Sequence, residues 1–447
     1  IHVQCVRASG EKRGVLIVAS HVRIGIAGLG TVGAGVLKII KAHGDLLEAR
    51  SGAHLVVTAV SGRDRTKDRG VSLDGVKWYD DARDLADDPD VDIVLELIGG
   101  SNGVARELCE KSLAKGKPVV TANKALLAEH GNALARLAEE NNAPLAYEAA
   151  VAGGIPIIKA LREGLAGNAI SRVYGILNGT CNYILTEMEE TGGEFAAILK
   201  DAQDLGYAEA DPSFDIDGVD AAHKLAILSS VAYGTPVDFS NIYIEGIREV
   251  SAADIASARE FGYRIRLLGV ARRTEKGIEQ RVHPCMVRRD TTIAHVNGVF
   301  NAVVVDGDFV SETSYVGRGA GEGPTASAVV ADIIDIAQGR HTPTFGIPVA
   351  RMTPIPTVPI AEHIGCYYVR LTVHDKPGVI ADVSAVFRDE NISIESLLQR
   401  GRASGEAVSV ILVTHEAKED ALVRALGKIE NFTHSVAKPR MIRIASL

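Results

Sequence analysis

A segment that combines closely spaced carboxylates with a lysine is the part of the chain best suited to chemistry. Residues 205–218 predict a loop, and residues 219–230 predict a helix that enters an apolar run. In that helix Asp220 and Lys224 lie four positions apart, on one face. The carboxylates of the segment are Glu209, Asp211, Asp215, Asp217 and Asp220, and the helix residues expected to face a core are Ala222, Leu225, Ala226 and Leu228.

Lys224 is a candidate proton donor and acceptor. Burial at the edge of a core lowers the pKa of an ammonium group, and nearby carboxylates raise it, so the environment can tune this lysine for proton transfer. The alternative is a capped surface helix that carries one ordinary ion pair.

A second lysine, Lys124, lies at the carboxyl end of a strand predicted over residues 117–124. Gly99 follows the neighbouring strand, predicted over residues 92–98. Because ligands bind at the carboxyl ends of strands in open α/β sheets, Lys124 is placed to contact a cofactor or a substrate. The alternative is an ordinary lysine at the start of a helix.

The beginning of the chain predicts a dinucleotide-binding domain. A β-type run over residues 22–27 leads into a glycine motif, and a helix is expected over residues 34–42. In this context the first glycine makes a tight turn and the second lets a pyrophosphate approach the backbone. The third lets helix and strand pack closely, and the helix N-terminus faces the phosphates. The motif consists of Gly28, Leu29, Gly30, Thr31, Val32 and Gly33.

The tip of the next predicted strand, residues 55–60, bears on the choice between NAD and NADP. A site selective for NAD usually has an acidic residue there, which binds the ribose hydroxyls. Ser61 occupies this tip instead, which favours NADP through its 2′-phosphate, although Asp64 keeps NAD open. The cations that follow are Arg63, Arg65 and Lys67.

Two further glycine-rich segments are candidates for ligand contacts. The backbone carbonyls of residues 149–156, beside Glu148, would suit a hard cation such as Na⁺, and an interdomain hinge is the alternative. Residues 317–325 open a helix expected over residues 326–337 and could face the far end of a cofactor. A flexible loop is the alternative for that segment.

The order of elements predicts an α/β protein with three domains. From residue 157 onward, mixed strands and helices predict a mixed sheet covered by helices. Five prolines between residues 341 and 362 predict a semi-rigid linker, and the order βαββαβ beyond it is ferredoxin-like. The expected parts are an N-terminal extension (1–21), a Rossmann domain (22–149), a mixed α+β substrate and dimerisation domain (150–341, with 318–341 packing back on the Rossmann domain), the linker (342–362) and a ferredoxin-like domain (363–447).

Composition argues against several classes of protein. The net charge is −9 and no basic block stands out, which argues against nucleic acid and anionic membranes as partners. No apolar run approaches the roughly 20 residues of a membrane span. The five cysteines are scattered, odd in number and lack a CxxC motif, as is typical of reduced thiols in a cytoplasm.

Together these motifs resemble the bacterial homoserine dehydrogenases of the long type, which carry a C-terminal ACT domain. The resemblance covers residues 22–447. It is carried by GLGTVG at 28–33, TANK at 121–124, YEAAVAGGIP at 147–156, NGTCNY at 178–183, GYAEADPSFDIDGVDAAHK at 206–224 and DKPGV at 375–379.

The resemblance implies NAD(P)-linked reduction of L-aspartate 4-semialdehyde to L-homoserine, in the synthesis of threonine, methionine and isoleucine. Lys224 then matches the acid/base lysine, and Lys124 matches the lysine that contacts cofactor and substrate. Glu209 matches the carboxylate that holds the substrate's amino group, with Asp215 and Asp220 nearby.

The resemblance also implies ion binding, regulation and assembly. Gly321 lies in a loop similar to one that closes on the nicotinamide. ACT domains usually pair and bind amino acids at the seam, so L-threonine is expected as an inhibitor and a homodimer or homotetramer as the assembly. The implied Na⁺ site consists of Glu148, Val151, Gly153 and Ile155.

Two other functions stay open on the sequence. In the first, Cys181 is the nucleophile of a semialdehyde dehydrogenase that forms a thioester, with His223 as its base. In the second, the chain is a non-enzymatic sensor of cofactor and amino acid. The presence of both Lys124 and Lys224 argues against a sensor, which has no need of an acid/base lysine.

Overall fold

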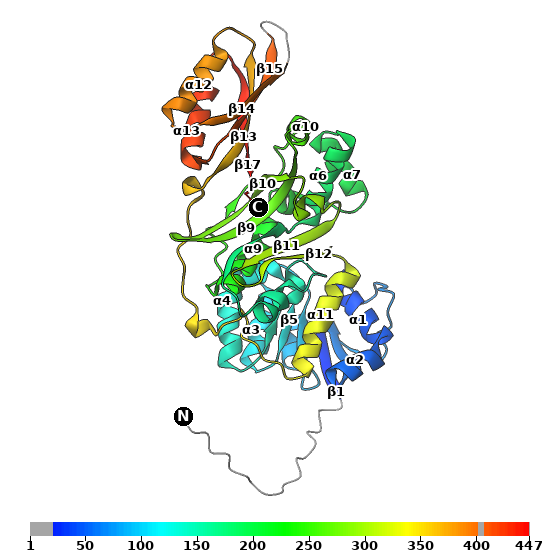
Figure 1. The fold of residues 1–447 in the computed structure, drawn as a ribbon. Coiled ribbons are helices and arrows are strands. Elements are labelled where there is room, and N and C mark those ends of the chain that lie inside the picture. Colours follow the sequence, from blue (N-terminus) through cyan, green and yellow to red (C-terminus); the bar gives the residue numbers. More distant parts are fainter. Residues whose placement is uncertain (1–20, 401–405, 447) are drawn as a thin grey trace, which may run out of the picture.

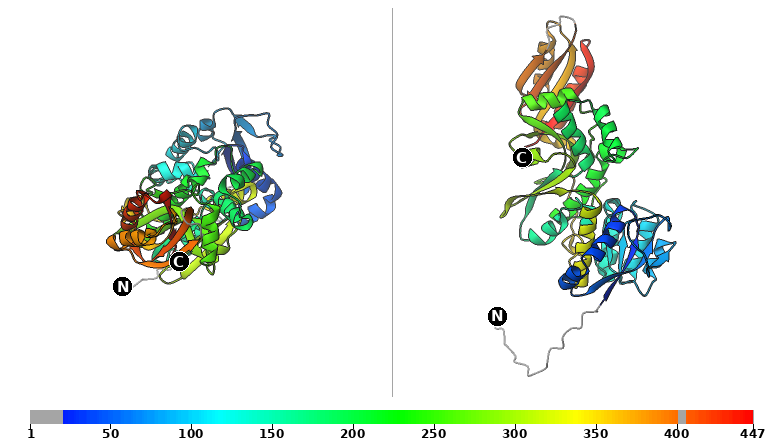
Figure 2. Two further views of the ribbon diagram at one scale, coloured as in Figure 1. Left: turned by 90° about the horizontal axis from the view of Figure 1, so that it is seen from above. Right: turned by 90° about the vertical axis from the view of Figure 1, so that its right-hand side faces the viewer.

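The computed structural model describes residues 21–400 and 406–446, which form an elongated molecule of three regions (Figure 1, Figure 2). A parallel sheet with its helices lies at one end, a mixed sheet in the middle and a small α/β domain at the other end. The N-terminal extension lies outside the described residues except for His21, which is the first residue of β1. Within the described part of the chain, no helix combines the length and apolar character that crossing a membrane requires.

The first region is a six-stranded parallel sheet with the order β3-β2-β1-β4-β5-β6. This is the order of dinucleotide-binding folds, in which the winding reverses between β1 and β4 and leaves a crevice at their carboxyl ends. The strands are β1 (His21–Ala27), β2 (His54–Ser61), β3 (Lys77–Tyr79), β4 (Ile93–Glu96), β5 (Val119–Thr121) and β6 (Leu145–Ala146), and the helices are α1 (Thr31–Ala42), α2 (Gly44–Ser51), α3 (Val104–Ala114) and α4 (Lys124–Glu140).

Helix α11 (Glu322–Ala337) comes from much later in the chain and packs beside α1 (Figure 1). Gly35 permits this close approach, because a Cβ atom there would lie 2.9 Å from the Cβ of Ala326. Nζ of Lys38 also lies 2.7 Å from Oε1 of Glu322. Since the buried face of α11 shares the core of β1, this helix is part of the dinucleotide-binding region.

The middle region is a sheet with the order β12-β11-β7-β9-β10, and helix α9 packs against it. The predicted core face of α9 is confirmed, since Ala222, Leu225, Ala226 and Leu228 have no exposed surface. The strands are β7 (Ile170–Ile176), β8 (Tyr243–Ile244), β9 (Tyr263–Thr274), β10 (Gly277–Arg288), β11 (Phe300–Gly307) and β12 (Ser311–Arg318), and the helices are α5 (Ile157–Lys159), α6 (Gly179–Thr191), α7 (Phe195–Asp204), α8 (Ser213–Ile216), α9 (Val219–Tyr233) and α10 (Ala252–Glu260).

The C-terminal region has the strand order β17-β13-β15-β14, which is the ferredoxin-like arrangement. Strand β17 also pairs in parallel with β10, through Cys285 with Arg443 and Met286 with Ile444. The middle and C-terminal sheets are therefore one continuous sheet, a feature that the sequence did not predict. The elements are β13 (Ile364–His374), α12 (Val379–Asp389), β14 (Ile394–Arg400), β15 (Ala407–Thr414), β16 (Ala417–Lys418), α13 (Glu419–Glu430) and β17 (Ser435–Ile444).

The proline-rich linker runs along the side of the molecule, from the dinucleotide-binding end to the C-terminal region (Figure 1). The amide of Ile278 donates to the carbonyl of Pro356 at 2.8 Å, and the amide of Val358 donates to the carbonyl of Ile278 at 2.9 Å. Near its start, the ring of Phe345 is fully buried. The linker is thus held against the body of the protein by backbone pairing and apolar packing.

Candidate active site

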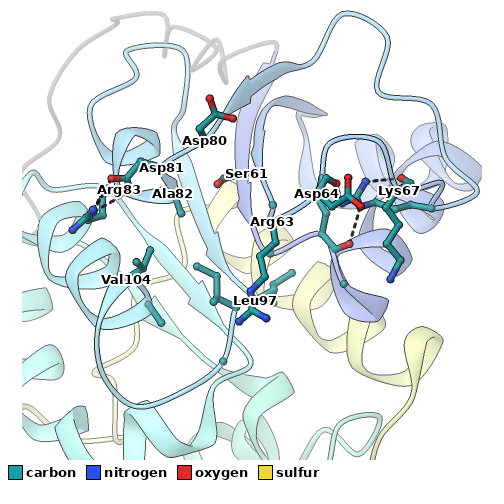
Figure 3. A pocket seen from close by; sticks show the side chains of 18 of the residues that line it. Ser61, Arg63, Asp64, Lys67, Asp80, Asp81, Ala82, Arg83, Leu97 and Val104 are labelled. Carbon is teal, nitrogen blue, oxygen red and sulfur yellow. Dashed lines mark hydrogen bonds and ion pairs between the residues drawn. The ribbon is translucent and has the colours of Figure 1, made fainter.

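A cavity of about 930 Å³ opens at the carboxyl ends of β1, β2 and β4 (Figure 3). This is the position at which parallel α/β sheets bind their ligands. Among the predicted cofactor residues, Gly28, Leu29, Gly30, Arg63 and Gly99 line the cavity, whereas Thr31, Val32, Gly33, Lys124 and Gly321 lie outside its lining.

The three glycines of the motif meet different steric needs. Gly28 has a φ of 101°, and a Cβ atom there would lie 2.4 Å from the carbonyl oxygen of Leu97. A Cβ at Gly33, in the first turn of α1, would lie 2.2 Å from the carbonyl oxygen of Gly28. At Gly30 such an atom would have no neighbour within 4 Å, so the backbone there is open to a pyrophosphate. These residues fit a dinucleotide, whose phosphates would face the N-terminus of α1.

The loop after β2 directs Arg63 and Asp64 differently. In Figure 3 the side chain of Arg63 extends into the cavity. Asp64 accepts hydrogen bonds from Oγ1 and N of Thr66, at 2.7 and 2.8 Å, and these bonds lower the pKa of its carboxyl group. Arg69 fixes the loop by donating to the carbonyl of Leu29 at 2.9 Å. Lys67 and Arg69 line the same cavity, but Arg69 donates to backbone carbonyls, so Arg63 and Lys67 are the cations of this loop placed to contact a cofactor.

Glu96, which sequence reasoning missed, shapes the turn that contains Gly99. Its side chain has no exposed surface and accepts from Oγ1 of Thr121 at 2.6 Å. It also accepts from the amides of Ile98 and Gly99, at 2.9 and 3.1 Å. The available signal was an acidic residue inside an otherwise apolar strand, because a buried carboxylate needs such donors.

Asp220 joins the two predicted lysines. Its Oδ2 lies 2.8 Å from Nζ of Lys224, and its Oδ1 lies 3.0 Å from Nζ of Lys124. Nζ of Lys224 also donates to the carbonyl of Leu177 at 2.7 Å. Nζ of Lys124, at the start of α4, lies 5.5 Å from the centre of the Phe214 ring. The fold therefore brings two lysines from distant helices to opposite oxygens of one carboxylate.

The charges of this group depend on burial and on mutual attraction. The side chains of Asp220 and Lys224 are only 5% and 10% exposed, whereas that of Lys124 is 33% exposed. Burial alone would raise the pKa of Asp220, but the two lysines hold this pKa well below its usual range. Burial alone would lower the pKa of Lys124, but Asp220 reverses this effect and the pKa is raised. Asp220 is thus ionised and Lys124 protonated at neutral pH.

The other predicted carboxylates lie at different distances from this group. Asp215 is half-buried, and Nδ2 of Asn178 joins it to Asp220 through two hydrogen bonds of 2.8 Å. Burial, and then the charge of Asp220, raise the pKa of Asp215. Glu209 is exposed, and its charge contributes only weakly to the raised pKa of Lys124. Sequence reasoning missed Asn178, although an Asn between a strand and a helix is a capping signal.

The predicted Na⁺ loop follows β6. The Glu148 carboxylate accepts from the amides of Ile158 and Lys159, at 2.9 and 2.8 Å. Burial, and then Asp332, raise the pKa of Glu148 to about 7. Because amide donors occupy this carboxylate, it is a poor primary ligand for a cation, and backbone carbonyls are the remaining ligands. Among residues 21–400 and 406–446, no cluster of three or more His, Cys, Asp or Glu side chains could hold a metal ion.

The same loop packs against the segment that leads into α11. Gly153 has a φ of 39°, and a Cβ atom there would lie 2.6 Å from the carbonyl oxygen of Gly319. Val151 and Ile155 are buried on either side of it. Gly321 precedes α11 with a φ of 123°. The two glycine-rich segments that the sequence singled out are therefore in direct contact.

Cys181 is poorly suited to act as a nucleophile. The residue is fully buried, and its Sγ donates to the carbonyl of Asp215 at 3.2 Å. Burial raises the pKa of the thiol well above its usual range, and reactive cysteines need the opposite shift. This geometry disfavours the thioester mechanism.

Comparisons with known proteins identify the family of the chain. Residues 28–148 match the homoserine dehydrogenase NAD-binding domain, residues 156–334 match the homoserine dehydrogenase domain, and residues 367–431 match the ACT domain. A homoserine dehydrogenase of Neisseria gonorrhoeae is 46% identical over 433 residues, which cover 95% of this chain and 99% of that protein.

Two solved structures extend the comparison. The crystal structure of a homoserine dehydrogenase from Thiobacillus denitrificans has a TM-score of 0.91 and 44% identity, and the match covers 96% of this chain and 99% of that one. A hyperthermophilic archaeal homoserine dehydrogenase in complex with NADPH has a TM-score of 0.60 and 31% identity, over 70% of this chain and 97% of that one. On this identity and coverage, the chain belongs to the homoserine dehydrogenase family.

Proposed function

We propose that the enzyme catalyses the reversible, NAD(P)H-dependent reduction of L-aspartate 4-semialdehyde to L-homoserine, in the biosynthesis of threonine, methionine and isoleucine. The observation that carries the proposal is the group of Lys124, Asp220 and Lys224. A bound reduced nicotinamide supplies the hydride. A cytoplasmic location is part of this proposal, because the substrates are metabolites of amino-acid synthesis.

The proposed roles follow from the hydrogen bonds. An ammonium group has three N–H donors, and Lys224 directs two of them to Asp220 and to the carbonyl of Leu177. The third is available to give a proton to the alkoxide that forms when the aldehyde is reduced, and Lys224 takes a proton from the alcohol in reverse. The Lys124 charge stabilises the same alkoxide. Asp215, Asp220 and Glu209 attract the substrate's ammonium group.

We propose NADP as the preferred cofactor, with Arg63 contacting its 2′-phosphate. Replacing Arg63 by alanine is expected to raise the KM for NADPH by about 10- to 100-fold, which is the usual value of a hydrogen bond to a charged group. The KM for NADH should change little. Both are measured by nicotinamide absorbance with L-aspartate 4-semialdehyde.

Arg65→Ala is the matched control for this experiment, because the Arg65 guanidinium lies over the Trp78 ring, at 5.9 Å from its centre, and does not line the cavity. An unchanged KM for NADPH in Arg63→Ala would refute the proposed contact. A parent enzyme inactive with both cofactors would refute the proposed reaction.

We propose that a Na⁺ ion binds the loop of Glu148, Val151, Gly153 and Ile155 through backbone carbonyl oxygens. The support is the chemistry of the loop, since hard cations prefer oxygen ligands and positive φ angles at Ala152 and Gly153 turn the backbone sharply. A cation there would stabilise the contact with the segment before α11, which includes Gly321.

For domains and assembly we propose the division 22–149, 150–341, 342–362 and 363–447, and a homodimer or homotetramer. The matched ranges 28–148, 156–334 and 367–431 support the division. Strand β12 ends one side of the long sheet, and exposed apolar residues lie on it and beside it, which is typical of a surface that pairs with another copy. The exposed apolar residues on or beside β12 are Phe300, Phe309, Val310 and Val316.

We propose that L-threonine inhibits the enzyme through the ACT domain. A route to the active site is supported by Arg443 of β17, whose Nη1 lies 2.7 Å from Oε2 of Glu245 in the middle region. The next residue, Gly246, touches the α8 turn, because a Cβ atom there would lie 2.1 Å from the carbonyl oxygen of Ile216. That turn carries Asp215, so a shift of the C-terminal region would move a carboxylate that is proposed to bind the substrate's ammonium group.

Glu245→Gln is expected to weaken inhibition by L-threonine while activity without threonine stays at the parent level. Since allosteric coupling is typically worth 5- to 150-fold in affinity, we expect the half-inhibitory concentration to rise by about fivefold or more. Glu245 accepts from the hydroxyl of Tyr243 at 2.9 Å. The control is Glu312→Gln, because Glu312 likewise accepts from the hydroxyl of Tyr174, at 3.1 Å, and lies far from β17 in the sheet. Equal inhibition of the parent and Glu245→Gln would contradict this route, and a parent indifferent to millimolar threonine would contradict the effector.

A further inference from the structure

Asn178 lies between Asp215 and Asp220, two of the carboxylates proposed to bind the substrate's ammonium group. The residue follows β7 and is 5% exposed. Its Oδ1 accepts from the amide of Cys181 at 2.8 Å and so caps helix α6. Its Nδ2 donates to Oδ1 of Asp215 and to Oδ2 of Asp220, both at 2.8 Å. Each polar atom of the side chain is therefore engaged, one in the fold and one at the site.

The bridge joins two groups that repel each other. Asp215 and Asp220 are both acidic and at least half-buried, and the charge of Asp220 helps to raise the pKa of Asp215. An amide NH₂ group has two donors and no charge, so it binds both carboxylates without adding a third cation to a group that already holds Lys124 and Lys224.

The residue before Asn178 fixes the acid/base lysine. The carbonyl of Leu177 accepts from Nζ of Lys224 at 2.7 Å, and Oδ2 of Asp220 accepts from both Lys224 and Asn178. The Leu177–Asn178 dipeptide therefore sets the direction of the Lys224 ammonium and the plane of the Asp220 carboxylate.

We propose that Asn178 is a positioning residue, which holds Asp215 and Asp220 together as the receptor for the substrate's ammonium group and thereby aligns Lys224. This role rests on the proposed reaction, because it needs a substrate that carries an ammonium group. The side-chain amide of Asn178 affects the reaction only through Asp215 and Asp220.

Removal of the amide has a defined effect on pH dependence. Three helices bring charged or polar groups to Asp215. Helix α9 brings Asp220 and Lys224, helix α4 brings Lys124, and helix α6 brings Thr180 and Cys181. The bond from Asn178 favours the ionised form of Asp215, so its loss raises the pKa of that carboxyl. Because the ionised form binds the substrate, the acid limb of kcat/KM moves to higher pH.

Asn178→Ser is the decisive variant, because serine keeps the helix cap and loses the bridge. We expect the KM for L-aspartate 4-semialdehyde to rise by about tenfold or more, with the acid limb displaced upward and the KM for NADPH unchanged. The control is Asn182→Ser, since Asn182 is likewise buried on α6 and, among the described residues, its amide donates to the carbonyls of Val296, Gly298 and Phe300 and to no carboxylate. That variant is expected to lower the thermal midpoint and leave the acid limb in place.

Three outcomes would overturn the role. The first is an Asn178→Ser enzyme with the parent's KM and pH profile, and the second is an equal displacement of the acid limb in both variants, which would indicate a general loss of structure. In both cases an active parent would leave the proposed reaction standing. The third is a parent without activity on the semialdehyde, which would refute the reaction and this role together.

Discussion

Replacing Lys224 by methionine is expected to lower kcat by about 10²- to 10⁴-fold, with little change in the KM for NADPH. This is the usual contribution of a positioned general acid, and the cofactor contacts lie on other elements. Methionine preserves much of the length and apolar contact of the lysine stem inside the buried helix α9, so the fold should persist. The measurement is the steady-state rate of NADPH oxidation with L-aspartate 4-semialdehyde.

A second variant separates proton transfer from charge. Lys224→Arg keeps a cation beside Asp220, but an arginine does not give up its proton in a protein, so kcat should again fall by about 10²-fold or more. The control is Lys200→Met, because Lys200 forms a comparable ion pair of 2.9 Å with Asp204 four positions away, on the exposed surface of α7. Parent-like turnover by Lys224→Met would refute the acid/base role of Lys224, whereas a parent without turnover would leave the sensor hypothesis as the one to test.

The local parts of the site could be predicted from the sequence. The glycine motif depends on a strand, a turn and a helix within a few residues, and each glycine has the steric reason expected of it. The pair of Asp220 and Lys224 follows from helix periodicity alone. Residues this close in the chain can adopt few relative positions, so the residue pattern and the chemistry were sufficient to predict these contacts.

Contacts between distant segments could not be predicted. The sequence placed Lys124 at a strand end, but only the fold shows that it shares a carboxylate with Lys224. The pairing of β10 with β17 likewise joins two domains that look separate in sequence. A strand pattern states which residues face a core, and it does not state which edge the strand will join.

Some element boundaries also differ from the sequence-based prediction. The strand predicted over residues 117–124 ends at Thr121, because Oδ1 of Asn123 accepts from the amide of Leu126 and starts α4 at Lys124. The helix predicted over residues 155–165 is present over residues 157–164, but only Ile157–Lys159 is an α-helix, and Ala160–Gly164 continues it as a π-helix. Asn123 is a capping residue, so the sequence contained the signal for the first of these differences. The π-helix has no comparable local signal.

Replacing Asp220 by asparagine is expected to have the other large effect, on activity and stability together. The substitution keeps the shape of the side chain but leaves Lys124 and Lys224 without their shared counter-charge. We expect kcat/KM to fall by about 10²-fold or more, because both lysines lose their orientation. The pKa of Lys124 should fall once Asp220 no longer raises it against burial, so the basic limb of the pH profile should move to lower pH.

The loss of stability should be about 3 kcal/mol, at the lower end of the range for a broken buried pair because Lys124 is one-third exposed. Since the folded pKa of Asp220 is depressed, its stabilising effect is complete above its unfolded pKa of about 4 and is lost only at lower pH. Because the pKa of Lys124 is raised in the folded protein, the stabilisation that Lys124 contributes stays complete up to its unfolded pKa of about 10. Urea unfolding should therefore give the same difference from the parent at about pH 5 and pH 8.

Asp217→Asn is the matched control, because Asp217 lies in the same segment but pairs with Arg248 on the exposed surface. Such a pair is worth at most about 1 kcal/mol, and its loss should leave the basic limb in place. If Asp220→Asn kept the parent's kcat/KM and basic limb, the shared carboxylate would not be what holds the two lysines for catalysis. If it lost activity but little stability, the two ammonium groups would be solvated without Asp220, and its role would be orientation alone.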